Sequence, residues 1–185
     1  SLVLTKEAKK WKKDPSLKEK VDKFTYHNME DYYLVCERPQ LQEFLDYLFE
    51  NFNVIVWTAA SKDYALFIIK NCIIAGRKNR QLSYIFFDYH CDLSQEIYKK
   101  DPQKCLKMLT DQGAFQLPNI KLDNIVIIDD LQDNKDSNGN NCIQIFPFKV
   151  YGIGSESDNH LMTVVKDKLE DIKKNGIKSD TLLKY

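Results

Sequence analysis

The chain has 185 residues, with 27 Lys plus Arg against 27 Asp plus Glu. This length suits one domain with a sizeable core. The balanced charge creates no global field that would favour direct binding to nucleic acid. No apolar run approaches the roughly 20 residues that a membrane helix needs, and the start shows no signal-peptide pattern. We therefore expect no membrane association.

The five cysteines are scattered, odd in number and form no CxxC pair. This is typical of reduced cysteines in a nuclear or cytoplasmic protein, rather than of a disulfide framework or a zinc site. His90-Cys91 is the only adjacent pair of soft metal ligands. Without a second pair at zinc spacing, we do not expect it to bind metal.

The first third of the chain combines short apolar runs with a basic stretch. Leu2-Val3-Leu4 predicts the end of a short buried strand. Residues 6–23 are rich in Lys around Trp11, with Pro15 interrupting, and predict a solvated stretch that is helical in parts and has no clean apolar face. Residues 32–35 predict another short strand.

From Arg38-Pro39 the pattern becomes clearer. Proline suits the first turn of a helix, and apolar residues follow at helical spacing (Leu41, Phe44, Leu45 and Leu48). Residues 53–57 predict a second buried strand. Ser61 is a plausible N-cap for the next helix, whose buried stripe would be Ala65, Ile68, Ile69 and Cys72.

The second half of the chain continues the alternation. Strands are predicted at 84–87, 125–128 and 142–145, and short helical patterns lie around Cys105–Leu109 and from Asp158 to a C-terminal cap at Asn175-Gly176. Strands that alternate with helices indicate an α/β fold with a parallel sheet. We therefore predict a three-layer, Rossmann-like sheet flanked by helices.

Asp129-Asp130 comes directly after a run of β-branched residues that predicts a strand buried on both faces. Ligand sites in parallel sheets form just beyond the carboxyl ends of the strands. Two adjacent carboxylates there would repel each other, and a cation would turn that repulsion into binding. Alternatively, the pair only opens a polar loop, because residues 132–136 are all polar.

Three segments match a known family. Glu37-Arg38-Pro39-Gln40-Leu41-Gln42-Glu43-Phe44-Leu45 is followed by Val54-Ile55-Val56-Trp57-Thr58-Ala59-Ala60-Ser61 and Tyr64-Ala65. This resembles the signature of the NLI-interacting-factor-like phosphatases, which include phosphatases of the RNA polymerase II C-terminal domain. They belong to the haloacid dehalogenase superfamily. The resemblance covers about residues 32–172 and implies a haloacid-dehalogenase-like sheet with a small β insertion after its first strand.

The resemblance implies a mechanism and a set of site residues. In the family an Asp attacks phosphorus and forms an aspartyl-phosphate, a second Asp acts as general acid and base, and Mg²⁺ bridges nucleophile and phosphate. Thr58 would bind a phosphoryl oxygen beside a helix N-terminus, with Ser61 and Tyr64 contacting substrate. Asp129 and Asp130 would form the metal side, and only one of them is expected to touch Mg²⁺, because successive strand side chains point oppositely.

The family also implies a lysine that neutralises phosphate charge. Tyr98-Lys99-Lys100-Asp101 resembles the family's "YxKDL", and the step from Cys91 favours Lys100 over Lys99. An ammonium there would act as a compact point charge.

The chain departs from the family at the first catalytic motif. The family reads "LVLDLDETL", whereas this chain reads Leu2-Val3-Leu4-Thr5-Lys6-Glu7. Without a gap, Thr5 falls on the nucleophile and Glu7 on the acid/base, and no neighbour in sequence activates the Thr5 hydroxyl. Either "DLDE" is lost before Thr5, or the residue that performs the covalent chemistry is truly absent.

Substrate identity is a further departure. Family members that act on the polymerase tail carry Arg near the positions of Asp88 and Gln95, which makes that tail a doubtful substrate here.

Two functions follow from the resemblance. The first is a Mg²⁺-dependent phosphoprotein (Ser/Thr) phosphatase whose partner is a phosphorylated protein or peptide. The second is a catalytically inactive pseudophosphatase that serves as a protein-binding module. We predict a single phosphatase-like domain over residues 1–185, with its core at about 32–174, a basic insertion at 6–23 and a C-terminal tail at 175–185. The sequence leaves the oligomeric state open.

Overall fold

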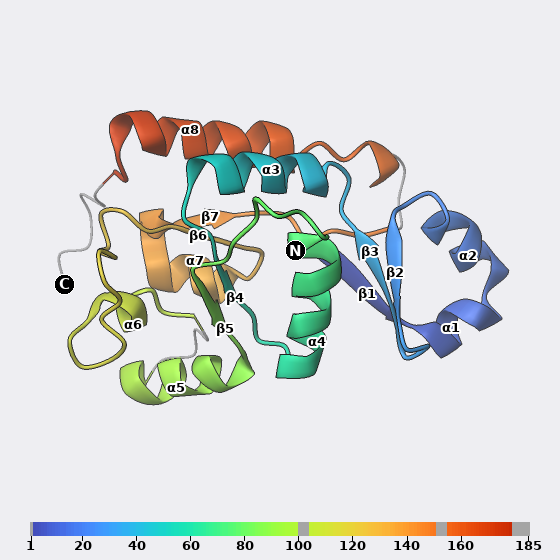
Figure 1. Ribbon diagram of the computed structural model, residues 1–185, viewed down its shortest axis with the longest axis horizontal. Helices are drawn as coiled ribbons and strands as arrows, with labels where there is room; N and C mark the ends of the chain where they lie inside the picture. Colours follow the sequence, from blue (N-terminus) through green and yellow to red (C-terminus); the bar gives the residue numbers. More distant parts are fainter. Residues whose placement is uncertain (1, 100–103, 151–154, 179–185) are drawn as a thin grey trace. The chain divides into compact units, whose positions relative to one another are not determined.

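A computed structural model describes residues 2–99, 104–150 and 155–178 (Figure 1). Contacts divide the chain into two compact units, so a single domain stays a prediction. The first unit comprises Ser1–Val54, Asp63–Ser83 and Phe146–Thr163, and the second unit comprises Ile55–Lys62, Tyr84–Ile145 and Val164–Tyr185. Within the described ranges, no helix is both long and apolar enough to cross a membrane.

Short strands alternate with helices, as the sequence predicts. The strands are β1 Val3–Glu7, β2 Tyr26–Met29, β3 Tyr33–Glu37, β4 Ile55–Trp57, β5 Tyr84–Phe86, β6 Ile127–Asp129 and β7 Cys142–Gln144. The α-helices are α1 Ala8–Lys13, α2 Pro15–Val21, α3 Leu41–Asn51, α4 Lys62–Ile68, α5 Asp88–Tyr98, α6 Lys107–Thr110, α7 Gln132–Asn138 and α8 Lys166–Asn175. Two π-helices, Ile69–Ile74 and Leu161–Val165, and two 3₁₀ turns, Gly139–Asn141 and Ser155–Ser157, complete the elements.

The first unit contains an antiparallel sheet in the order β1-β3-β2. Its central strand, β3, is buried from Leu34 to Glu37. Figure 1 draws α1 and α2 beside these strands, and Leu17 and Val21 of α2 pack in one cluster with Cys36. This antiparallel sheet agrees with the expected small β insertion.

The basic stretch is helical, but one expectation about it is wrong. Asp14 ends α1 and caps α2, since its carboxylate accepts hydrogen bonds from the backbone N–H groups of Ser16 (3.0 Å) and Leu17 (3.2 Å), and Pro15 begins α2. The hydrogen bond from the Ser16 hydroxyl (2.8 Å), and next those from the backbone, lower the pKa of Asp14. The stretch does have an apolar face, because α2 buries two side chains and Trp11 packs against the same cluster.

The second unit contains two parallel strand pairs, β4–β5 and β6–β7. Phe86, Leu106 and Leu109 form the buried centre of an apolar cluster against which residues of β4 and β6 pack. Two expectations about burial are wrong. The predicted buried strand at 53–57 is half-buried over Ile55–Trp57, and the strand at 125–128, predicted to be buried on both faces, is half-buried over Ile125–Ile128. Each of these strands has one paired neighbour in the described ranges, so its apolar side chains stay partly open.

Two helices differ from the sequence expectation. The polar run after Asp130 is not a loop, because Gln132–Asn138 forms α7, whose Asn134 is buried. The helix that follows Ser61 begins at Lys62 and continues beyond Ile68 as a π-helix that ends at Ala75, a residue in the left-handed region (φ 48°). The C-terminal cap at Gly176 is confirmed, with its N–H donating to the Ile172 carbonyl.

Candidate functional site

The carboxyl ends of the parallel strands in the second unit carry the predicted site residues. Thr58 follows β4 directly, and Asp129 is the last residue of β6. Both strands run parallel to their partners, β5 and β7. The carboxyl ends of parallel strands are where α/β sheets bind ligands.

A buried ion pair lies at the end of β6. The Lys104 ammonium donates to Oδ2 of Asp129 at 2.7 Å, and the two residues are 9% and 7% exposed. The other carboxylate oxygen accepts the N–H of Leu131 at 2.9 Å. Burial alone would raise the pKa of Asp129, but the charge and hydrogen bond of Lys104, with the buried amide of Asn134 and the Leu131 N–H, lower it. Asp129 is therefore held as a carboxylate.

The backbone that carries Lys104 is fixed by polar side chains from two helices. The Asn138 amide of α7 donates to the Lys104 carbonyl at 2.8 Å and accepts the Leu106 N–H at 2.9 Å. The buried hydroxyl of Ser94 in α5 accepts the Cys105 N–H at 3.1 Å. Because these partners satisfy the backbone, the segment can leave regular structure without unpaired polar groups.

Thr58 is partly buried, and its hydroxyl oxygen accepts the Ala60 N–H at 3.1 Å. A hydroxyl that accepts one hydrogen bond still has a proton to donate. The Thr58 N–H donates to the Phe86 carbonyl at 3.0 Å, which extends the pairing of β4 and β5 by one residue. The main chain of Thr58 is therefore held in place by its neighbours.

Cys91 contacts the main chain of Thr58. Its thiol donates to the Thr58 carbonyl at 3.6 Å. Burial raises the pKa of this thiol, while the side chain of Trp57 and the positive charge of Lys104 oppose the rise. Thr58, Lys104 and Asp129 all belong to the second unit.

The remaining predicted residues lie in different places. Ser61 is in the second unit and exposed. Thr5, Glu7 and Tyr64 are in the first unit, where the Thr5 and Tyr64 hydroxyls are hydrogen-bonded to each other. Glu7 is exposed and pairs with Lys10 at 3.1 Å. The β1 strand that carries Thr5 and Glu7 is antiparallel to β3, so neither residue extends a parallel strand.

Lys104 was missed by the sequence reasoning, and Lys100, the predicted lysine, lies outside the described residues. Lys104 stands immediately before a buried apolar run that begins at Cys105 and Leu106. A lysine at such a boundary has its ammonium near the protein interior, where it needs an acidic partner. That signal was available in the sequence, because Asp129-Asp130 offered a partner.

Further side chains with oxygen atoms follow Asp129 in the sequence. Asp130 follows at the strand end, and Asn134 is 1% exposed with no hydrogen bond of ordinary geometry to its amide among the described residues. Carboxylate and amide oxygens are the ligands that Mg²⁺ prefers. Asp129 is already neutralised by Lys104, which leaves Asp130 as the better carboxylate for a metal.

The sequence model of the family "NLI interacting factor-like phosphatase" matches residues 2–180. The chain belongs to this family.

Viral relatives show the same membership. The CTD phosphatase-like protein 355R of Invertebrate iridescent virus 6 is 46% identical over 153 residues, which cover 82% of each chain. Its counterpart in Invertebrate iridescent virus 3 is 43% identical over 142 residues, covering 75% of this chain and 74% of that protein.

Solved structures support the fold. The fission yeast RNA polymerase II CTD phosphatase Fcp1, in a structure bound to beryllium fluoride, matches with a TM-score of 0.53 and 17% identity over 94% of this chain. The chain spans about half the length of that structure, 48%. At this identity the likeness shows a haloacid-dehalogenase-like α/β fold, as predicted from the sequence, and the family membership shows a phosphatase-like domain.

Proposed function

We propose that this chain is a Mg²⁺-dependent phosphoprotein phosphatase domain that acts through an aspartyl-phosphate. The observation that carries the proposal is the buried Lys104–Asp129 pair at the carboxyl end of β6, in the same unit as Thr58 at the carboxyl end of β4. A desolvated ammonium that is held in place is suited to a multiply charged phosphoryl group. The family membership supports the same reaction class.

Each residue has a separate task. The Thr58 hydroxyl donates to a phosphoryl oxygen, and the Lys104 ammonium neutralises charge that builds up on the phosphoryl group. Asp129 holds Lys104 at 2.7 Å and is a positioning residue. Asp130 and Asn134 would hold Mg²⁺, which would supply neutralisation of phosphate charge.

The chemistry itself needs a carboxylate nucleophile. Attack on phosphorus forms an acyl-phosphate bond and breaks the bond to the leaving oxygen, which takes a proton from a general acid; water then cleaves the acyl phosphate and returns the carboxylate. Among the described residues, Thr5 and Glu7 occupy the gapless positions of these groups, and both lie on an antiparallel strand.

The proposed substrate is a phosphorylated protein or peptide. Relatives are named CTD phosphatase-like, which is in keeping with a phosphorylated polypeptide. The five cysteines are all buried and free, as suits a reducing compartment, nuclear or cytoplasmic.

A second candidate is a catalytically inactive module that binds phosphorylated partners. The placement of Thr5 and Glu7 favours it, because neither is a carboxylate at the end of a parallel strand. Thr58 and Lys104 would still bind phosphate without turnover.

Hydrolysis of an aryl phosphate, with Mg²⁺ or with a chelator, tests the first proposal. We expect Mg²⁺-dependent turnover that Lys104→Met and Asp130→Asn abolish. Lys107→Met is the matched control, because Lys107 lies nearby on α6 and is exposed. Inorganic phosphate binding, followed by calorimetry, separates the two candidates: binding that depends on Lys104 without turnover supports the module. Absence of both binding and turnover in the parent chain contradicts both.

A further inference from the structure

Three metal-ligating side chains meet in the first unit, away from the residues assigned above. They are His27 in β2, Glu37 at the end of β3 and Cys72 in the π-helix Ile69–Ile74. One ligand atom from each lies within 4.8 Å of the others. His27 and Glu37 meet because β2 and β3 are antiparallel: His27 pairs with Val35, so Glu37 is its diagonal neighbour on the same face.

Burial makes this cluster unusual. Glu37 is 7% exposed and Cys72 is fully buried, while the His27 side chain is 25% exposed. His27 Nε2 lies 2.7 Å from Oε1 of Glu37, within hydrogen-bond distance. In the described ranges the Glu37 carboxylate pairs with no Lys or Arg. A buried carboxylate beside a buried thiol is costly unless a cation or hydrogen bonds compensate. The partly exposed imidazole provides a path from solvent.

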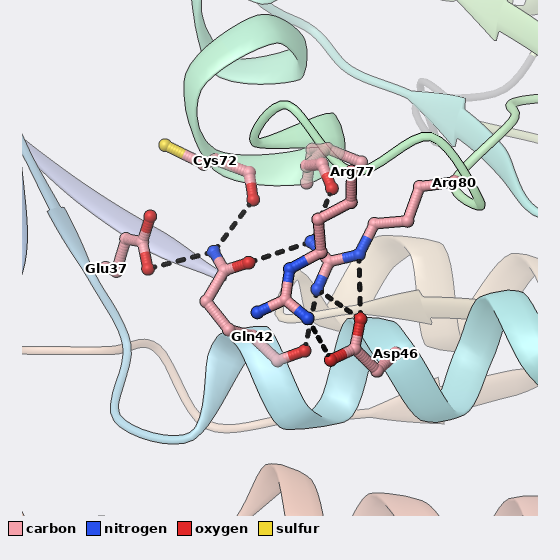
Figure 2. A network of polar contacts seen from close by, with 7 residues as sticks. Glu37, Gln42, Asp46, Cys72, Arg77 and Arg80 are labelled. Atoms are coloured by element: carbon pink, nitrogen blue, oxygen red, sulfur yellow. Dashed lines mark hydrogen bonds and ion pairs between the residues drawn. The ribbon is translucent and has the colours of Figure 1, made fainter.

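A polar network fixes the other side of the cluster (Figure 2). The Gln42 amide donates to Oε2 of Glu37 at 3.0 Å and to the Cys72 carbonyl at 3.0 Å. The Gln42 oxygen accepts from the buried Arg80 guanidinium at 2.8 Å. This leaves Oε1 of Glu37 directed to His27. Partners of this kind orient metal ligands in known sites.

The backbone at Cys72 is also irregular. Residues 69–74 form a π-helix, a conformation that is rare and is found frequently at functional sites. Figure 2 shows the Cys72 side chain directed away from Gln42 on the side of Glu37. The cysteine is therefore presented to the carboxylate by a helical turn that differs from the regular α-helix before it.

We propose that His27, Glu37 and Cys72 bind a zinc ion, with the fourth position left to water or an external ligand. Imidazole nitrogen, carboxylate oxygen and thiolate sulfur are the usual zinc ligands, and the thiolate and imidazole disfavour Mg²⁺ and Ca²⁺. Zinc would join the β2–β3 hairpin to the π-helix, which is 35 residues further along the chain from Glu37 (72 minus 37).

Metal binding has a defined proton balance. Burial, and next the charge of Glu37, raise the pKa of the Cys72 thiol to about 12. Zinc would therefore displace the thiol proton to solvent, and the His27 ring nitrogen that binds zinc must carry no proton. The site was not visible in the sequence, because its ligands are ten and 35 residues apart and form no local motif.

Metal titration of the full chain under reducing conditions tests the proposal. After removal of metals, we expect about one zinc per chain to resist a competing chelator, and Co²⁺ to give a thiolate charge-transfer band and a tetrahedral visible spectrum. A hydrogen-bonded cluster without metal affinity would show neither. The cobalt spectrum of the parent chain alone decides this, whether or not any variant folds.

Matched variants identify the ligands. Cys72→Ala and Glu37→Gln should weaken zinc binding at least about tenfold, and Cys72→Ala should abolish the cobalt–thiolate band. Cys36→Ala is the control, because Cys36 is adjacent in sequence to Glu37, equally buried, and packs into the apolar cluster with Leu17. Equal zinc affinity in Cys72→Ala, or equal loss in Cys36→Ala, overturns the assignment. Phosphatase activity is a separate readout, so the two proposals can fail independently.

Discussion

A buried cation of the first unit, Arg80, and one of the second unit, Lys104, each pair with a carboxylate but differ in how many hydrogen bonds they make. In the first unit, Arg80 is 2% exposed and pairs with Asp46 at 2.8 Å. In the second unit, Lys104 pairs with Asp129 at 2.7 Å. Similar charges at similar distances thus occur in two different settings.

The Arg80 guanidinium uses all its N–H groups inside the protein. It donates to Asp46 through Nε and Nη2, and to Gln42 and the Ile73 carbonyl through its remaining N–H groups. Lys104 has three N–H donors, and in the described part of the chain its ammonium has a single hydrogen-bond acceptor, Asp129. A saturated cation stabilises the fold, whereas an unsaturated one can receive a ligand.

The largest expected effect is on Arg80. Arg80→Met should lower the free energy of unfolding by about 3–5 kcal/mol, since it leaves the Gln42 and Ile73 acceptors without their donor and removes one of the two arginines that pair with Asp46. Urea unfolding followed by circular dichroism measures this. Arg77→Ala removes a half-exposed partner of the same carboxylate and should cost less than about 1 kcal/mol. Equal losses in the two variants would contradict a saturated, structural Arg80.

Lys104→Met should be the next largest, at about 2–3 kcal/mol, because Asp129 is left buried without its cation. The double variant Lys104→Met/Asp129→Leu should recover most of that stability, since no charge then remains buried. The double variant should still bind inorganic phosphate as weakly as Lys104→Met does. Recovery of phosphate binding in the double variant would show that Lys104 does not contact the ligand.

Acidification should lower the free energy of unfolding by an amount that differs between Asp46 and Asp129, and both amounts should be smaller than the effects above. The pKa of Asp46 is lowered by its hydrogen bond and charge interaction with Arg80, and that of Asp129 by Lys104 against the opposing effect of burial. A lowered pKa stabilises the fold above the unfolded pKa of about 3.9, and this contribution disappears as the pH falls through the folded value.

Unfolding at about pH 6 and at about pH 3, in parent and variants, measures this contribution. Asp129→Asn should reduce the difference in unfolding free energy between the two pH values more than Asp46→Asn does, because Asp129 is more buried. Asp14→Asn, at an exposed helix cap, is the control and should change it least. A reversed order would mean that burial does not set the size of these contributions.

A smaller loss of stability than at Arg80 or Lys104 is expected at Thr58. Thr58→Val removes the acceptor of one hydrogen bond from Ala60 and should cost about 1 kcal/mol. Phosphate affinity should fall about tenfold, which equals the loss of one hydrogen bond to an anion. Thr58→Ser keeps the hydroxyl and should keep the affinity. An unchanged affinity in Thr58→Val would remove Thr58 from the proposed site.

Apolar periodicity predicted the order of elements and the position of Asp129 at a strand end. These features depend on residues that are close in sequence, such as the β-branched run before Asp129 or the i, i+3, i+4 pattern of Leu41, Phe44 and Leu45. Local rules were sufficient there.

Features set by distant neighbours were missed. The identity of the paired lysine depends on where the chain around Lys104 meets β6, 25 residues later. The burial of β4 and β6 depends on how many strands flank each of them, which strand sequence alone does not reveal. Helix α7 was missed because its residues are polar, and it is held by buried Asn134 and by the Asn138 contacts with residues 104–106.

The five buried thiols can also be used to measure local opening of each unit. Cys36 and Cys72 lie in the first unit, and Cys91, Cys105 and Cys142 lie in the second unit. A buried thiol reacts with a disulfide reagent only when its surroundings open. The labelling rates of the two groups under native conditions therefore tell, without any engineered probe, whether the units open together or one at a time.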